Sequence, residues 1–170
     1  MRRLILSGLL LLGACKRESL APVVIEEPAG LAQTVEMGNH EHAKQLGKGF
    51  YAVEDGAWRW TQGKFSLQLR PPVQASTRGA TLVLKATIPP PVIEKLKDVT
   101  LTAVVNSVRL KTVHYNRAGG VVLRLDVPPN AFQTDQAAIE FVLDKVLPPR
   151  PEDQRELGLI VTSIGFERKT

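Results

Sequence analysis

A cluster of aromatic and charged side chains between residues 49 and 61 has the composition of a sugar-binding surface. It contains both tryptophans, one of the two tyrosines, an acidic residue and a basic residue: Tyr51, Glu54, Trp58, Arg59 and Trp60. An exposed aromatic ring offers a rigid apolar surface with polar edges, which suits stacking on a pyranose ring. Glu54 and Arg59 could then form hydrogen bonds with sugar hydroxyls. On this interpretation the five residues form a carbohydrate-binding site.

The same cluster also has a structural interpretation. Aromatic residues make up only 5% of the chain, so a core needs the large ones. Phe50 and a tryptophan would then pack inside the domain, and Glu54 and Arg59 would form an internal ion pair between the first two strands. Burial is the common fate of tryptophan, which favours this interpretation. The exposure of Tyr51, Trp58 and Trp60 distinguishes the two.

Catalytic and metal-binding motifs are not found in the sequence. It contains no Gly-x-Ser-x-Gly elbow, zinc motif or phosphate-binding loop. Glu54 with Asp55, and Glu140 with Asp144, supply the residue type that glycoside hydrolysis needs, but such carboxylates occur on any protein surface. His40-Glu41-His42 lacks the i, i+4 spacing that places two histidines on one helix face. We therefore expect no catalytic residue, metal or cofactor.

The segments that must position this cluster alternate between apolar and polar residues with a period of two. Four such runs occur after residue 47, at 64–70, 81–88, 123–127 and 139–144, and each predicts a strand with one buried face. Residues 98–115 predict a hairpin, because Asn106-Ser107 separates two β-branched runs at the spacing of a two-residue turn. This register places Val105 opposite Val108 and Val104 opposite Arg109.

Breaks rich in proline or glycine separate these strands, at residues 71–72, 89–91, 117–120, 128–129 and 148–151. Residues 93–97 could form one helical turn, but no long amphipathic helix joins the strands, which argues against parallel β-α-β units. The predicted fold for residues 47–170 is all-β: an antiparallel two-sheet β-sandwich, jelly-roll-like, with about eight strands.

The N-terminus has the pattern of an export signal. Arg2 and Arg3 precede an apolar run at residues 4–12, which is too short for a transmembrane helix but suits a signal peptide. The run ends in Leu12-Gly13-Ala14-Cys15, which resembles the lipobox of bacterial lipoproteins. That resemblance implies cleavage before Cys15, a diacylglyceryl thioether on its sulfur, and a further acyl chain such as palmitate on the new amine. Two or three acyl chains anchor a protein stably to a membrane.

Residues 15–46 are predicted to form a flexible tether, with one weak helical turn at 31–37, because prolines and glycines interrupt any apolar period. Lys16 follows the cysteine, where aspartate often marks inner-membrane retention in lipoproteins. We therefore expect the periplasmic face of the outer membrane if the host is diderm. Removing Arg2 and Arg3 leaves 20 basic against 17 acidic residues, a surplus of +3 without any basic run, so nucleic-acid binding is not expected.

The opening Gly49-Phe50-Tyr51, then Glu54 and Trp58-Arg59-Trp60, together with the closing segment 153–166, resembles β-sandwich modules found beside bacterial glycosyltransferases. The resemblance implies a shape similar to that of carbohydrate-binding modules. Two functions remain open. One is a lipid-anchored, non-catalytic module that binds envelope or surface carbohydrate. The other is a structural adaptor that docks another envelope protein through a sheet edge or face.

Overall fold

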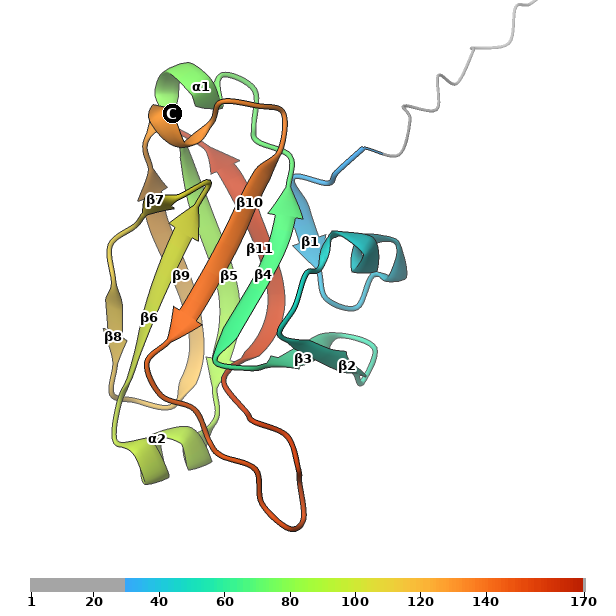
Figure 1. The fold of residues 1–170 in the computed structure, drawn as a ribbon, viewed down its shortest axis with the longest axis vertical. Coiled ribbons are helices and arrows are strands. Elements are labelled where there is room, and N and C mark those ends of the chain that lie inside the picture. The colour runs from blue at the N-terminus through green and yellow to red at the C-terminus, as the bar shows by residue number, and fades with distance from the viewer. Residues whose placement is uncertain (1–29, 170) are drawn as a thin grey trace, which may run out of the picture.

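The computed structural model describes residues 30–169, which fold into two antiparallel β-sheets packed face to face (Figure 1). The elements in chain order are β1 (Thr34–Glu36), the 3-10 helix η1 (His40–Gln45), β2 (Phe50–Glu54), β3 (Trp58–Thr61), β4 (Lys64–Leu69), α1 (Ala75–Arg78), β5 (Ala80–Ile88), α2 (Pro90–Leu96), β6 (Val99–Val105), β7 (Val108–Arg109), β8 (Val113–Tyr115), β9 (Gly119–Val127), the 3-10 helix η2 (Pro129–Ala131), β10 (Ala137–Leu143) and β11 (Ile160–Arg168).

The strand order confirms the predicted fold class. The first sheet runs β2-β3-β11-β5-β9, and β1 also pairs with β11. The second sheet runs β4-β10-β6-β7, and β8 also pairs with β6. The described residues form eleven strands rather than about eight. β1, β7 and β8 are only two or three residues long, and β1 carries too little pattern to be predicted.

One hydrophobic core lies between the two sheets. The apolar residues of the four predicted alternating runs are buried on the inner faces of β4, β5, β9 and β10, as the period of two requires. Phe65 of β4 stacks on Phe141 of β10 with ring centroids 4.9 Å apart. At the other end of the core, Phe132 and Phe166 meet edge to face at 5.4 Å. The core is therefore built mainly from aliphatic side chains with two aromatic pairs.

The predicted hairpin is confirmed as β6 and β7. Asn106 and Ser107 both have positive φ angles, 45° and 73°, which is the backbone of the hairpin turn whose twist matches that of the strands. Val105 lies opposite Val108 and Val104 opposite Arg109. The helical turn predicted at 93–97 is part of α2, which starts with prolines in its first turn, where their missing N–H groups cost nothing.

Residues 31–46 differ from the expected tether. The helical turn predicted at 31–37 is instead the strand β1, which pairs with β11, and η1 follows it. Val35 and Met37 are fully buried. Two apolar residues spaced by two are enough to bury one face of a short strand, but they are too few to reveal a period in the sequence. The sandwich therefore extends into the segment assigned to the tether. The signal peptide and Cys15 lie outside the described residues.

None of the helices within residues 30–169 is long and apolar enough to cross a membrane.

Candidate functional site

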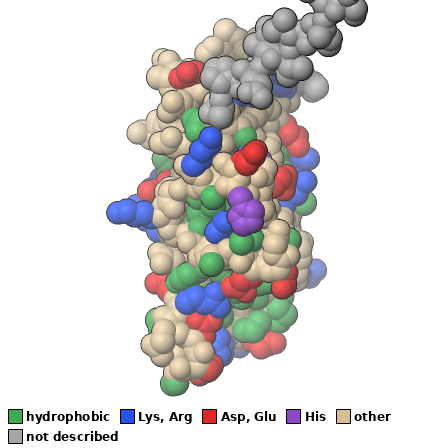
Figure 2. Space-filling view, turned by 90° about the vertical axis from the view of Figure 1, so that its right-hand side faces the viewer, with side chains coloured by type: hydrophobic (Ala, Val, Ile, Leu, Met, Phe, Trp, Pro, Cys, Tyr) green, Lys and Arg blue, Asp and Glu red, His purple; other side chains and the backbone are tan. Residues whose placement is uncertain are grey.

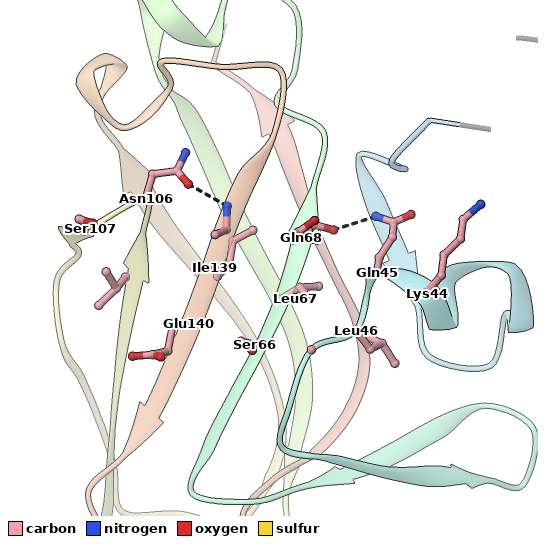
Figure 3. A pocket seen from close by; sticks show the side chains of 13 residues that line it. Lys44, Gln45, Leu46, Ser66, Leu67, Gln68, Asn106, Ser107, Ile139 and Glu140 are labelled. Atoms are coloured by element: carbon pink, nitrogen blue, oxygen red, sulfur yellow. Dashed lines mark hydrogen bonds between the residues drawn. The ribbon is translucent and has the colours of Figure 1, made fainter. Parts of the chain in front are cut away.

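A groove with a volume of about 620 Å³ lies on the outer face of the second sheet (Figure 3). The strands β4, β10 and β6 form its floor, and the segment that follows η1 forms one wall. We call this hollow the sheet groove. Its lining residues are Lys44, Gln45, Leu46, Gly47, Ser66, Leu67, Gln68, Val104, Asn106, Ser107, Ala138, Ile139 and Glu140.

The floor of the sheet groove follows from strand alternation. Ser66 and Gln68 occupy the outward positions of β4, between buried residues that face the core. Opposite them on β10 lie Glu140 and Ala138, and Val104 of β6 continues the row beyond Glu140. The side chains of Ser66 and Ala138 are short, so they leave space above the strands in the middle of the groove. The result is a channel of mixed polar and apolar lining between longer side chains.

The wall of the sheet groove is a short stretch of chain that covers the outer edge of β4. The amide of Gly47 donates to the carbonyl of Ser66 at 2.7 Å, and the amide of Ser66 donates to the carbonyl of Lys48 at 3.0 Å. The buried Gln45 side chain donates to the carbonyl of Gln68 at 2.8 Å, the contact drawn in Figure 3. The edge of β4 is therefore satisfied, and the wall is held in one position.

Glycine at 49 allows this stretch of chain to pass so close to β4. Gly49 has a φ of +89°, and a Cβ there would lie 2.7 Å from the Cα of Phe65 and closer still to the carbonyl oxygen of Lys64. Any side chain would push the wall away from the strand, and the backbone angle itself disfavours residues other than glycine. The wall therefore depends on a residue without a side chain.

The polar side chains of the sheet groove divide into two groups. Asn106 serves the fold: its amide nitrogen donates to the carbonyl of Ala131 at 2.9 Å, and its oxygen accepts from the amide of Ala138 at 2.8 Å. Gln45 is engaged in the same way. By contrast, the side chains of Ser66, Gln68 and Ser107 form no hydrogen bond with any residue of 30–169. These free groups can donate to and accept from a ligand.

Charge in the lining of the sheet groove comes from one carboxylate, that of Glu140, and one ammonium group, that of Lys44. Glu140 pairs with Lys64 at 3.0 Å, and both side chains are largely exposed. Lys44 lies at the rim of the wall. Glu140 is the only acidic residue in the lining, and its predicted companion Asp144 accepts a hydrogen bond from the amide of Thr100 at 2.6 Å. The second carboxyl group of a glycosidase pair is therefore not found in the lining of this groove.

The aromatic cluster predicted as a ligand site lies elsewhere. Its five residues sit on the β2–β3 hairpin, and none of them lines the sheet groove. Tyr51, Trp58 and Trp60 are each partly buried, and Tyr51 and Trp60 pack against the core. Phe50 packs edge to face on the buried Phe65 with centroids 5.3 Å apart. Phe50, Tyr51 and Trp60 therefore have a packing role, as in the structural interpretation of the cluster.

The predicted ion pair between Glu54 and Arg59 is wrong. Glu54 instead accepts from the guanidinium of Arg155 at 2.7 Å. Arg59 donates to two backbone carbonyls, those of Tyr51 at 2.9 Å and Met37 at 3.2 Å. The cause is register: Arg59 lies opposite Val53 and Glu54 lies opposite Trp58, so the two charged residues are not cross-strand partners. Arg59 therefore ties β3 to β2 and to the end of β1.

Arg155 is the centre of an ion-pair network that sequence reasoning did not identify. Its guanidinium forms a two-bond contact with Asp153 at 2.9 Å, and it lies 5.3 Å from the centre of the Tyr51 ring. Hydrogen bonds from Arg155 lower the pKa of Asp153 to about 2. This network attaches residues 144–159, the long loop at the bottom of Figure 1, to the β2–β3 hairpin. A pair separated by 101 residues leaves no local signal in the sequence.

The histidine motif also has a local structural role. Nδ1 of His42 accepts a hydrogen bond from the amide of Glu36 at 3.0 Å, and Asn39 caps η1 through the amide of Glu41. Within residues 30–169 no group of three or more histidine, cysteine or acidic side chains is placed to hold a metal ion.

Exposed apolar side chains do not gather into one large patch on the described part of the chain. The large hydrophobic residues that stand out are Val73, before α1, and Val122, on β9. Figure 2 shows the edge of the sandwich that carries η1 and the β2–β3 hairpin, where apolar, basic and acidic side chains are mixed. An apolar docking face of the kind expected for an adaptor is not seen there.

Comparison with known proteins shows what this architecture resembles. No family model matches the chain, and neither does any curated protein. Among solved structures, the carbohydrate-binding module TmCBM27, described for specific mannan recognition, matches with a TM-score of 0.50 and 14% identity over 83% of this chain and 98% of that one.

Two further matches have lower TM-scores. A CBM36 module in complex with calcium and xylotriose has 13% identity and a TM-score of 0.43 over 79% of this chain and 98% of that one. The CBM36-1 domain of a multidomain xylanase from the hindgut metagenome of Trinervitermes trinervoides has 10% identity and a TM-score of 0.46 over 81% and 97%. At these identities the similarity concerns the fold alone, which is a β-sandwich of the shape found in carbohydrate-binding modules.

Proposed function

We propose that this chain is a non-catalytic module that binds a carbohydrate chain in the sheet groove. The observation that carries the proposal is the free polar lining: side chains of Ser66, Gln68 and Ser107 face an open channel without internal partners among residues 30–169. Sugar hydroxyls both donate and accept hydrogen bonds, and hydroxyl and amide side chains do the same. A groove on the outer face of a sheet is not an enclosed cavity, which suits part of a polymer better than a small, fully buried ligand.

Two further features support a binding role without catalysis. The fold has the shape of a module that recognises mannan in the structural comparison. The groove lining holds one carboxylate, whereas hydrolysis of a glycosidic bond generally uses two that flank the bond. Glu140 is therefore assigned to hydrogen bonding with the ligand and to its pair with Lys64.

The proposal includes a lipid anchor on Cys15. The lipobox at residues 12–15 supports it, and the expected location is the periplasmic face of the outer membrane in a diderm host. The Cys15→Ser variant is expected to move the protein from the membrane fraction to the soluble fraction after cell lysis. Unchanged membrane retention of that variant would contradict the anchor, and it would leave the binding role to be judged separately.

The binding role is tested by filling the groove. Ala138 is exposed in the middle of the floor, so Ala138→Trp places a large ring in the channel without disturbing the core. Val122→Trp places the same ring on the exposed surface of the other sheet and serves as the control. We expect a glycan array to identify a ligand whose affinity falls by about tenfold or more in Ala138→Trp and stays unchanged in Val122→Trp.

Other outcomes would overturn the assignment. If Ala138→Trp binds normally while Trp58→Ala loses the ligand, the β2–β3 hairpin carries the site. If the wild-type protein binds no glycan but captures an envelope protein, and Ala138→Trp abolishes that capture, the groove is a protein-docking site and the adaptor function replaces ours.

A further inference from the structure

The sheet groove continues into a second hollow along β4. This second hollow has a volume of about 350 Å³ and is lined by Lys48, Gln62, Lys64, Phe65, Ser66 and Glu140. Ser66 and Glu140 line both hollows, so the two adjoin, and we call them together the long groove. Lys64 and Gln68 are four residues apart on β4, which is about 13 Å at roughly 3.3 Å per residue. The long groove is therefore longer than one sugar ring.

The lining of the long groove is basic. Lys44, Lys48 and Lys64 line it against a single carboxylate, that of Glu140. Lys44 and Lys48 are exposed, and neither forms an ion pair within residues 30–169. Lys64 pairs with Glu140, so Lys44 and Lys48 supply the excess positive charge of the lining. A groove with one excess sign of charge attracts ligands of the opposite sign.

The groove is built to hold a glycan rather than an acidic peptide strand. A peptide that adds to a sheet needs a free strand edge, and residues 46–48 already occupy the outer edge of β4. Between the lysines the lining offers neutral amides and a hydroxyl, from Gln62, Gln68 and Ser66. Its only aromatic ring, that of Phe65, is fully buried, so stacking contributes little and polar contacts must supply the affinity.

We propose that the long groove binds acidic polysaccharides, in which Lys44, Lys48 and Lys64 pair with the carboxylates of uronic acid units while Gln62, Ser66 and Gln68 hydrogen-bond the hydroxyls. This inference rests on the proposed function and names its ligand class. The lysines are spread along the channel rather than gathered at one point. The match is therefore to a polymer with repeated charge, and a single terminal carboxylate would engage only part of the site.

The test compares two forms of one polymer. Polygalacturonate carries a carboxylate on each unit, and its methyl-esterified form has the same backbone with that charge removed. We expect titration calorimetry to show binding of polygalacturonate, about tenfold weaker binding of the ester, and a loss of about tenfold when the ionic strength rises from about 0.05 to 0.3 M.

Matched variants locate the effect. The combined variant Lys44→Gln, Lys48→Gln, Lys64→Gln removes three charges from the groove, and Lys85→Gln, Lys95→Gln, Arg117→Gln removes three from exposed positions outside its lining. We expect about a tenfold loss of polygalacturonate binding in the first and less than a twofold change in the second. Melting curves of both variants verify that they fold.

Each remaining result overturns the inference. Equal binding of the ester, equal losses in the two triple variants, or no binding of polygalacturonate removes the acidic ligand. Equal binding of polyglutamate shows that the groove recognises charge without recognising sugar. If a neutral glycan binds and only Ala138→Trp abolishes its binding, the proposed function stands and this inference fails. If Ala138→Trp has no effect on any bound glycan, the proposed function fails as well.

Discussion

The sheet groove and the β2–β3 hairpin differ in composition and in how far their side chains are engaged within the fold. The hairpin holds both tryptophans and three charged residues, and most of these groups already have partners: Glu54 has Arg155, Arg59 has two backbone carbonyls, and Trp60 packs against the core. The groove holds no exposed aromatic ring, but several of its side chains have no partner among residues 30–169. The aromatic and charged residues that stand out in the sequence therefore already contact other parts of the fold, whereas the small polar residues of the groove are available to a ligand.

The difference follows from how each region is attached. The hairpin is at the end of its sheet and is held by side chains, so its large and charged residues are needed for packing and ion pairing. The groove floor is the outer face of strands held by backbone hydrogen bonds and by the core beneath them. The outward side chains of Ser66 and Gln68 are not needed to hold these strands together, so they are available to a ligand.

The largest expected effect is on the wall that joins the two regions. Gly49→Ala would force a side chain onto the backbone of β4 at a positive φ, so we expect a loss of about 3 kcal/mol or more in the free energy of unfolding. Gly56→Ala is the control, because it has a similar φ of +64° but nothing within 4 Å of the added Cβ. It should cost about 1–2 kcal/mol. Equal losses in urea denaturation would show that close approach does not matter at Gly49.

The tryptophans provide the next largest effect. Trp60 packs against the core, so Trp60→Ala should lower the free energy of unfolding by about 2 kcal/mol. Trp58 is partly exposed and outside the core cluster, so Trp58→Ala should cost less than about 1 kcal/mol. Neither variant should change glycan binding at temperatures where it is folded. Loss of binding in Trp58→Ala with an unchanged melting temperature would show that the glycan-binding site is on the β2–β3 hairpin.

The sequence predicts the fold and the groove floor for the same reason. The alternation in 64–70 and 139–144 identifies Phe65 and Phe141 as core, and the same alternation places Ser66 and Glu140 on the outer face. What it does not show is the wall. Residues 44–48 have no apolar period, and 44–46 are predicted as part of the tether. The hydrogen bonds that hold this stretch to β4 join positions about twenty residues apart.

The ion pairs show the same limit. Glu54 and Arg59 are close in sequence and opposite in charge, which favours a pair, but the three-residue turn between β2 and β3 pairs Glu54 with Trp58 and Arg59 with Val53. The partner that Glu54 uses, Arg155, belongs to a loop that carries no strand or helix pattern. Which face a residue occupies can be predicted from local period, whereas which distant residue it meets depends on the tertiary structure.

A double-mutant cycle measures this correction directly. The Glu54–Arg155 pair is about one-third exposed on both sides, so removal of both residues should reveal a coupling energy of about 0.5–1 kcal/mol. The same cycle for Glu54 and Arg59 should give a coupling energy near zero, because Arg59 contacts only backbone carbonyls. The measurement is chemical denaturation of the single and double alanine variants. A larger coupling energy for Glu54 with Arg59 would contradict the pairing described above.

The smallest expected effect is a pH dependence of stability. It arises at the network that attaches residues 144–159 to the β2–β3 hairpin, and not at the groove. Hydrogen bonds from the side chain and the backbone amide of Arg155 lower the pKa of Asp153 from its ordinary value of 3.8 to about 2. A carboxylate whose pKa is lower in the folded state stabilises the fold above its unfolded pKa, and that contribution is lost as the pH falls through the folded value. The window is therefore between about pH 4 and pH 2.

Asp153→Asn isolates this contribution, because the variant keeps an oxygen that can accept from the backbone amide but carries no charge. The wild-type protein should melt at a slightly higher temperature than Asp153→Asn at pH 5, and the difference should shrink as the pH falls from 4 to 2. The pKa values of Asp98 and Glu167 are also lowered, by Lys145 and Arg124, but both proteins share these residues and their effects cancel. A difference that stays constant down to pH 2 would mean that Arg155 holds the loop through packing on Tyr51 and not through charge.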